Sequence, residues 1–85
     1  MESFEPKKLA LIRIWQILKD YSDYDHPLTQ EDIAVKLENE YGIVIERKAI
    51  SRNISLLKEA GIDIESRRAG SYLERREFED SELHM

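Results

Sequence analysis

The chain has 85 residues, of which 41% are hydrophobic and 36% charged, and its formal net charge at pH 7 is −5. This length suits one small domain, and no apolar run approaches the roughly 20 residues that a membrane-spanning helix needs. The sequence contains no cysteine and only two, widely separated histidines, which excludes disulfides and thiolate metal sites, and we expect neither a metal nor a cofactor.

The N-terminal part of the chain predicts one long helix. Residues 1–5 are acidic and have neither the basic nor the apolar region of a signal peptide, so we expect a cytoplasmic protein. Pro6 suits the first turn of a helix, and the stretch through Tyr21 contains no glycine or further proline. Seven apolar residues share one broad face of this helix, which we expect to be core: Ala10, Leu11, Ile14, Trp15, Ile17, Leu18 and Tyr21.

Two other apolar residues of this helix, Leu9 and Ile12, fall outside the core face. A buried aliphatic side chain contributes about 1.5–3 kcal/mol, so we expect something to cover both. One possibility is a homodimer through this helix; a further C-terminal region is the other candidate for a dimer contact. The alternative is a contact within the chain, from Phe4 or from the segment after Phe78.

A polar loop and a second helix follow. Residues 22–27 are rich in turn-forming residues and end in proline, which predicts the loop. Thr29 with Asp32 three residues later is a capping-box pattern, so the second helix should span about 30–41. Gly42 occupies the position of a left-handed C-terminal cap.

The C-terminal half predicts a third helix and a hairpin. The β-branched residues 43–45 can form one short strand or an extended connector. The third helix spans about 47–60 and ends at Gly61. Residues 62–65 and 71–74 are the two strand candidates, so we expect a β-hairpin there.

The order helix, helix, short strand, helix and two-stranded ribbon predicts a mainly α fold with a small β-hairpin, the winged helix-turn-helix. Its parts are three helices and a wing. We expect this domain to span residues 1–76, and residues 77–85 to begin a linker toward a further C-terminal region. In this fold the last helix enters the major groove of DNA, and the ribbon touches the backbone or the minor groove.

Charge is distributed unevenly along the chain. Residues 18–46 carry two basic against eight acidic side chains, whereas residues 47–76 carry eight basic against four acidic ones. The asymmetry, rather than the negative total, indicates an anionic partner for the second half. Residues 47–58 contain four cations and no acid, which is unusual for an ordinary solvated helix face.

The third helix separates into two sides when it is wound at about 100° per residue. Its apolar side holds Ala49, Ile50, Ile54, Leu56, Leu57 and Ala60. Its opposite side holds the candidate DNA-binding residues Arg47, Lys48, Ser51, Arg52, Ser55 and Lys58. Arginine can bond guanine through two N–H groups, while serine permits close approach and donates to phosphate.

Two arginines and one asparagine outside this set also carry side chains that can bond DNA or the backbone. At the predicted hairpin tip, Arg67 and Arg68 are candidates for phosphate or minor-groove contacts. Asn53 lies within the apolar arc of the third helix, and its amide needs partners if it is buried. We expect Asn53 to bond the second helix or the wing backbone rather than DNA.

Several motifs together carry a family resemblance. They are AISRNISLLKEAG at 49–61, PLTQEDI at 27–33, YGI at 41–43, GSYL at 70–73 and FEDSEL at 78–83. The first resembles the recognition helix of DeoR-type helix-turn-helix domains, and the chain from Lys7 to Leu83 resembles the N-terminal domain of bacterial WYL-domain transcriptional regulators. The family often has arginine at the position of Ser51 and aspartate at that of Asn53, so the base preference need not be the same. The resemblance implies a fragment or a naturally short relative of such regulators.

We therefore expect sequence-specific binding of double-stranded DNA, with helix 47–60 in the major groove and hairpin 62–74 as the wing. We expect no enzymatic activity, because the acidic residues form no constellation with a metal ligand set or a nucleophile. The alternative is a winged-helix protein-interaction module whose acidic second helix binds a basic partner.

Overall fold

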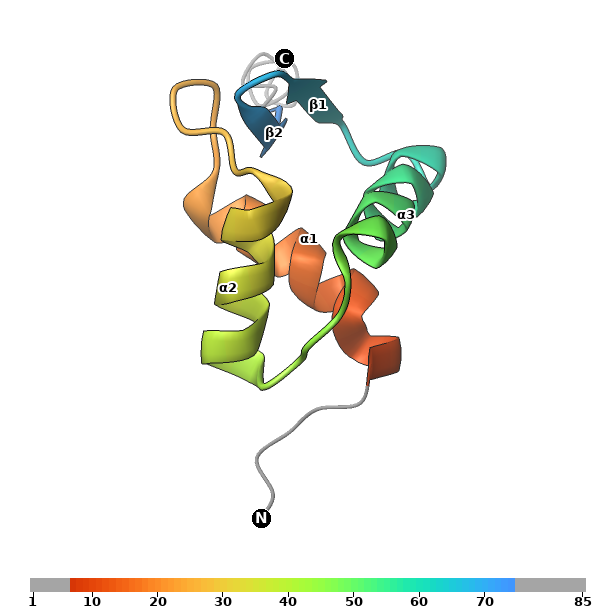
Figure 1. The fold of residues 1–85 in the computed structure, drawn as a ribbon. Helices are drawn as coiled ribbons and strands as arrows, with labels where there is room; N and C mark the ends of the chain where they lie inside the picture. Colours follow the sequence, from red (N-terminus) through yellow and green to blue (C-terminus); the bar gives the residue numbers. More distant parts are fainter. Residues whose placement is uncertain (1–6, 75–85) are drawn as a thin grey trace, which may run out of the picture.

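Three helices and a two-stranded hairpin make up the fold (Figure 1). A computed structural model describes residues 7–74 of the chain. The elements are a short 3-10 turn η1 (Lys7–Leu9), α1 (Ala10–Tyr21), α2 (Gln30–Tyr41), α3 (Arg47–Glu59), β1 (Ile64–Arg67) and β2 (Gly70–Leu73). This arrangement confirms the predicted fold class, a mainly α winged helix-turn-helix with a small hairpin as the wing.

Local sequence signals fix both ends of α2. The Thr29 hydroxyl accepts from the Asp32 N–H at 3.0 Å, and the Asp32 carboxylate accepts from the Thr29 N–H at 3.0 Å. This reciprocal pair satisfies two of the N–H groups that a helix start leaves without partners. Gly42 ends the helix in the left-handed conformation with φ 68°, and its N–H bonds the Glu38 carbonyl. The predicted bounds of α2 are confirmed.

The short strand expected before α3 does not form, and a single bridge residue between α1 and α2 pairs with the wing instead. Residues 42–46 contain no strand, so the second of the two expectations, an extended connector, holds for this segment. Leu28, between α1 and α2, instead pairs with Ser71 of β2 through two backbone hydrogen bonds of 2.8 Å. Ile43 instead places its side chain in the core, with 1% exposure, and its N–H bonds the Leu37 carbonyl at the end of α2.

The hairpin is displaced relative to the prediction. β1 begins at Ile64 rather than at residue 62, because Ile62 still donates to the Leu57 carbonyl at the end of α3. β1 then continues to Arg67, which pairs with Gly70. The turn therefore consists of two residues, Arg68 and Ala69, instead of the five-residue tip that the sequence suggested.

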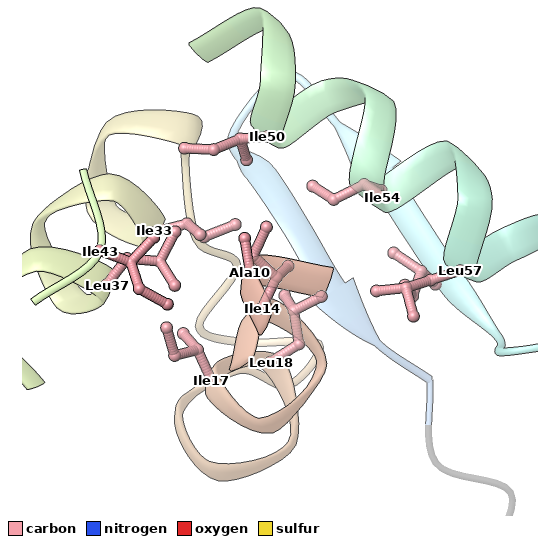
Figure 2. Packing of buried hydrophobic residues seen from close by; sticks show 11 residues of the cluster. Ala10, Ile14, Ile17, Leu18, Ile33, Leu37, Ile43, Ile50, Ile54 and Leu57 are labelled. Carbon is pink, nitrogen blue, oxygen red and sulfur yellow. The ribbon is translucent and has the colours of Figure 1, made fainter. Parts of the chain in front are cut away.

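The three helices enclose one hydrophobic core (Figure 2). Its members are Ala10, Ile14, Ile17 and Leu18 of α1, Ile33 and Leu37 of α2, Ile43 of the connector, Ile50, Ile54 and Leu57 of α3, and Ile64 of β1. Leu11 and Trp15 of the predicted core face are partly buried and pack against this cluster. The core thus orients α3 with one narrow side inward and the rest of its surface outward.

Three residues predicted to lie on apolar faces, Tyr21, Leu56 and Ala60, are exposed instead. Tyr21 is 43% exposed, because its hydroxyl donates to the Glu40 carboxylate at 2.7 Å and the Lys36 ammonium lies 3.9 Å from its ring centre. Leu56 is 52% exposed. It lies about 100° from Leu57 around α3, beyond the narrow inward stripe.

Ala60 is also exposed, and it forms the C-cap of α3 rather than its last turn. Ile12 is 47% exposed and Leu9 is partly buried, so a homodimer contact through them stays a prediction. Phe4 and the segment after Phe78, the alternative covers, lie outside the described residues, as does the predicted linker at 77–85. Within residues 7–74, no helix is long and apolar enough to cross a bilayer.

Candidate nucleic-acid interface

The two faces of the wing differ because side chains alternate along a strand. In the antiparallel pairing, Ser66 lies opposite Ser71 and Arg67 lies opposite Gly70. Ser66 and Ser71 therefore share one face, and their hydroxyl oxygens are 2.9 Å apart. Lys58 of α3 donates to the Ser66 hydroxyl at 3.2 Å, which shows that this serine face is turned toward α3.

A groove of about 470 Å³ lies between α3, the start of α2 and the wing. Five of the eight predicted site residues line it: Ser51, Ser55, Lys58, Arg67 and Arg68. Gln30 of α2 and the two wing serines, Ser66 and Ser71, add further hydrogen-bonding groups, and the Gln30 amide donates to the Ser51 hydroxyl. None of the described residues that line this groove is acidic, although the whole chain has a net charge of −5.

Lys48 and Arg52 lie on the outward side of α3, away from this groove. Both are exposed, and neither forms a side-chain hydrogen bond or ion pair with another residue in the described part of the chain. Arg52 borders a shallow hollow together with Ser51, Ser55 and Leu56. Its guanidinium donors are therefore free to reach a ligand that approaches this side of α3.

Arg47, the first residue of α3, is already engaged. Its guanidinium Nη2 lies 3.1 Å from the Glu31 carboxylate of α2, and the two side chains are 67% and 68% exposed. A pair this exposed is worth only about 0.2–1 kcal/mol, so a phosphate could replace the carboxylate at small cost. Arg47 lies at the opposite end of α3 from Lys58 and does not line the groove.

Arg67 and Arg68, which the sequence analysis considered together, differ in their side-chain contacts. The Arg67 guanidinium donates to the Tyr24 carbonyl at 2.7 Å and lies 4.6 and 5.1 Å from the ring centres of Tyr24 and Tyr72. Those rings meet edge to face, with centres 5.7 Å apart. Arg68, in the turn, is exposed and forms no side-chain hydrogen bond or ion pair among residues 7–74.

Sequence reasoning missed Tyr24 and Tyr72 as partners of Arg67. The sequence could have predicted the contact with Tyr72, because a two-residue turn at 68–69 makes Arg67 and Tyr72 diagonal neighbours on one face of the hairpin. The sequence analysis assumed a longer tip, and that tip gives a different strand register in which these two residues are not neighbours. Nothing in the sequence placed Tyr24 beside the wing, because that contact joins residues 43 positions apart.

The partner predicted for Asn53 is wrong. Its side-chain amide donates to the Ala49 carbonyl of its own helix at 2.9 Å, rather than to α2 or the wing. The carbonyl four residues back is the nearest acceptor for a short polar side chain within a helix, and it satisfies a side chain that is only partly buried. Asn53 therefore acts locally within α3.

Two ionisable groups near the wing have shifted pKa values. The hydrogen bond from His26, 2.8 Å long, lowers the pKa of the Asp23 carboxyl below its ordinary value. Burial raises the pKa of the Tyr72 phenol, with a smaller contribution from the nearby Glu74 carboxylate. Tyr72 is therefore neutral throughout the physiological range, and its ring remains a partner for the Arg67 cation.

No group of three or more metal-ligating side chains occurs among the residues that the structure describes. Comparison with family models, with curated proteins and with solved structures finds no match to this chain. The chemistry of the groove and of the outward face of α3 is therefore what points to a function.

Proposed function

We propose that the chain binds double-stranded DNA sequence-specifically, as the DNA-binding domain of a transcriptional regulator, with α3 in the major groove and β1–β2 as the wing. The observation that carries this proposal is the groove between α3, the start of α2 and the wing, which is basic, rich in hydroxyl groups and free of acidic lining residues. Such a lining suits a phosphate backbone, which takes hydrogen bonds from lysine, arginine and serine alike. The resemblance to the N-terminal domain of WYL-domain regulators agrees with it.

Within this proposal, base reading falls to the outward side of α3. An α-helix fits the major groove, where each base pair presents a distinct pattern of donors and acceptors. Arg52 is exposed and unpaired within residues 7–74, with Ser51 and Ser55 beside it, so its guanidinium can approach a base edge closely. Lys58 and Arg68 border the groove and are better placed for the backbone.

Selection from a pool of random duplexes tests the proposal directly. The chain should enrich a defined sequence, and its affinity for that sequence should fall steeply with salt, because each neutralised phosphate releases counterions. Arg52→Ala should cost about 1–3 kcal/mol of binding free energy and relax the preference at one base pair, if this side chain reads a guanine. A pool that shows no enrichment, together with no salt-dependent binding, would refute the proposal.

A second candidate function is favoured by another groove. About 370 Å³ in volume, it lies between α2 and the connector, where Val35 and Val44 are 49% and 59% exposed. Glu31, Glu38 and Glu46 also line this groove, as does Arg47, which pairs with Glu31. An apolar surface with an acidic border suits a basic protein partner, so the fold would then be an interaction module. In that case the chain should not bind duplexes even at low salt.

A further inference from the structure

The two arginines at the wing tip occupy different environments, and the difference follows from the register of the hairpin. Arg67 is the last residue of β1, so its side chain projects to the face that also carries Tyr72. Gly70, directly opposite Arg67, has no side chain, and the Leu28 backbone lies where its Cβ atom would be. Arg68 is in the turn and belongs to neither face.

The face that carries Arg67 is covered by the loop between α1 and α2, which runs beside the hairpin in Figure 1. Tyr24 of this loop packs its ring edge to face against Tyr72 and offers its backbone carbonyl to the Arg67 guanidinium. Four residues later, Leu28 pairs with Ser71. The Ser22 hydroxyl at the start of this loop also accepts from the Leu73 N–H at 3.0 Å, so the loop touches the wing at three points, and the Arg67 contact is the one nearest the turn.

Arg67 is well suited to hold these parts together. Its planar guanidinium can stack on aromatic rings and still donate to a carbonyl, which a lysine ammonium does less well. The cluster of Tyr24, Arg67 and Tyr72 uses both properties, with two ring contacts and one hydrogen bond. By contrast, the exposed Arg68 side chain makes no such contact within residues 7–74.

We propose that Arg67 is a positioning residue, which fixes the wing tip to the α1–α2 loop through Tyr24 and so holds Arg68 in the orientation that contacts a DNA phosphate. This inference rests on the proposed DNA-binding function. A wing held in one orientation binds more tightly than one that samples several, because the apparent affinity is reduced by the fraction of molecules that are not competent. Only Arg68 then contributes directly to the salt dependence of wing binding.

A double-mutant cycle on the whole chain tests the proposal. Tyr24→Ala removes no charge, and Tyr24 is not among the residues that line the groove. Tyr24→Ala and Arg67→Ala should each weaken binding to the selected duplex about two- to fivefold, the fold-change that corresponds to 0.5–1 kcal/mol for an exposed cation–π contact. The double variant should be weaker than wild type by less than the product of the two single effects, since either substitution alone removes the contact between the Arg67 guanidinium and the Tyr24 ring, whereas the Tyr24 carbonyl is kept in Tyr24→Ala.

Arg68→Ala is the matched control, because it removes the neighbouring charge without touching the cluster. It should lower the slope of log affinity against log salt by about 0.9, the value for one phosphate contact. Arg67→Ala and Tyr24→Ala should share one slope. Two results together would overturn the proposal. They are an unchanged affinity in Tyr24→Ala, and a salt slope in Arg67→Ala that is lower by about 0.9 than the slope in Tyr24→Ala. Arg67 would then touch DNA itself.

A measurement without DNA separates failure of this inference from failure of the proposed function. The cluster should protect the Leu28 and Ser71 amides from hydrogen exchange, so Arg67→Ala and Tyr24→Ala should speed their exchange and Arg68→Ala should not. If the wild type binds no duplex but this pattern appears, the structural part of the inference stands and the DNA-binding proposal fails. Unchanged exchange in Arg67→Ala would overturn the positioning role.

Discussion

Gly70→Ala is expected to detach the wing from the helical core. A Cβ atom at Gly70 would lie 2.6 Å from both the carbonyl carbon and the oxygen of Leu28, and 2.9 Å from its nitrogen. All three are backbone atoms, so no side-chain rotation can relieve the overlap. The Leu28–Ser71 pairing, with its two hydrogen bonds of 2.8 Å, would have to open.

Two terms set the size of the effect. Losing two backbone hydrogen bonds costs about 1–3 kcal/mol at about 0.5–1.5 each. Gly70 also has φ 141°, and an L-residue held in such a sparsely populated region costs about 1–3 kcal/mol. A chain of this size has a total stability on the order of 4–13 kcal/mol, so the loss is a large fraction of it.

Gly61→Ala is a matched control. Gly61 also has a positive φ, 101°, but a Cβ there would meet nothing within 4 Å. Urea unfolding, monitored by Trp15 fluorescence, should show that backbone strain destabilises both variants. Amide exchange at Leu28 and Ser71 should show that the pairing between these two residues is lost only in Gly70→Ala. Equal destabilisation by the two variants, with both amides still protected, would refute the steric argument.

Four further predictions concern other parts of the molecule. Arg52→Ala should weaken duplex binding about 5- to 150-fold with an unchanged unfolding curve, and equal affinity would remove the outward side of α3 from recognition. Ser22→Ala should destabilise the fold by about 1–3 kcal/mol in urea unfolding, because the buried hydroxyl accepts from a main-chain N–H of β2 at 3.0 Å. A variant as stable as wild type would contradict this. The pKa of Asp23 is lowered in the folded state by His26, so the stability it contributes is present above its ordinary value of 3.8 and is lost as the pH falls through the lowered value. Asp23→Asn should therefore flatten the acid limb of the stability profile, and an unaltered profile counts against the pair. Ile12→Glu should shift a homodimer to monomer in sedimentation equilibrium, whereas a wild type that is already monomeric at high concentration excludes α1 as a dimer surface.

Features that depend on neighbours in sequence were predictable. Thr29, Asp32 and Gly42 define α2 through hydrogen bonds that span three or four residues, and these signals gave its bounds. The apolar spacing of Ile50, Ile54 and Leu57 likewise gave the inward side of α3. Helical periodicity and capping chemistry are local properties, so a sequence alone can carry them.

Features that depend on how elements pack were not predictable. Helical winding placed Leu56 on the apolar side, but only packing decides how wide the covered stripe is, and 52% of Leu56 stays exposed. The candidate site shows the same limit. Winding identified Arg52 and Ser55 correctly as residues on the uncovered side of α3, yet it could not show that Arg67 would meet a tyrosine from the loop between α1 and α2.

The contacts between the wing and the α1–α2 loop also bear on the order in which the chain folds. The Arg67–Tyr24 hydrogen bond joins residues 43 positions apart, and that between Leu73 and Ser22 joins residues 51 apart. Bringing such distant residues together costs loop-closure entropy before the contact can form, whereas helical turns form between residues that are close in sequence. During synthesis, all three helices emerge before β2 does. We therefore expect the helical core to form first and docking of the wing to be the last step, with the slowest refolding phase sensitive to Tyr24.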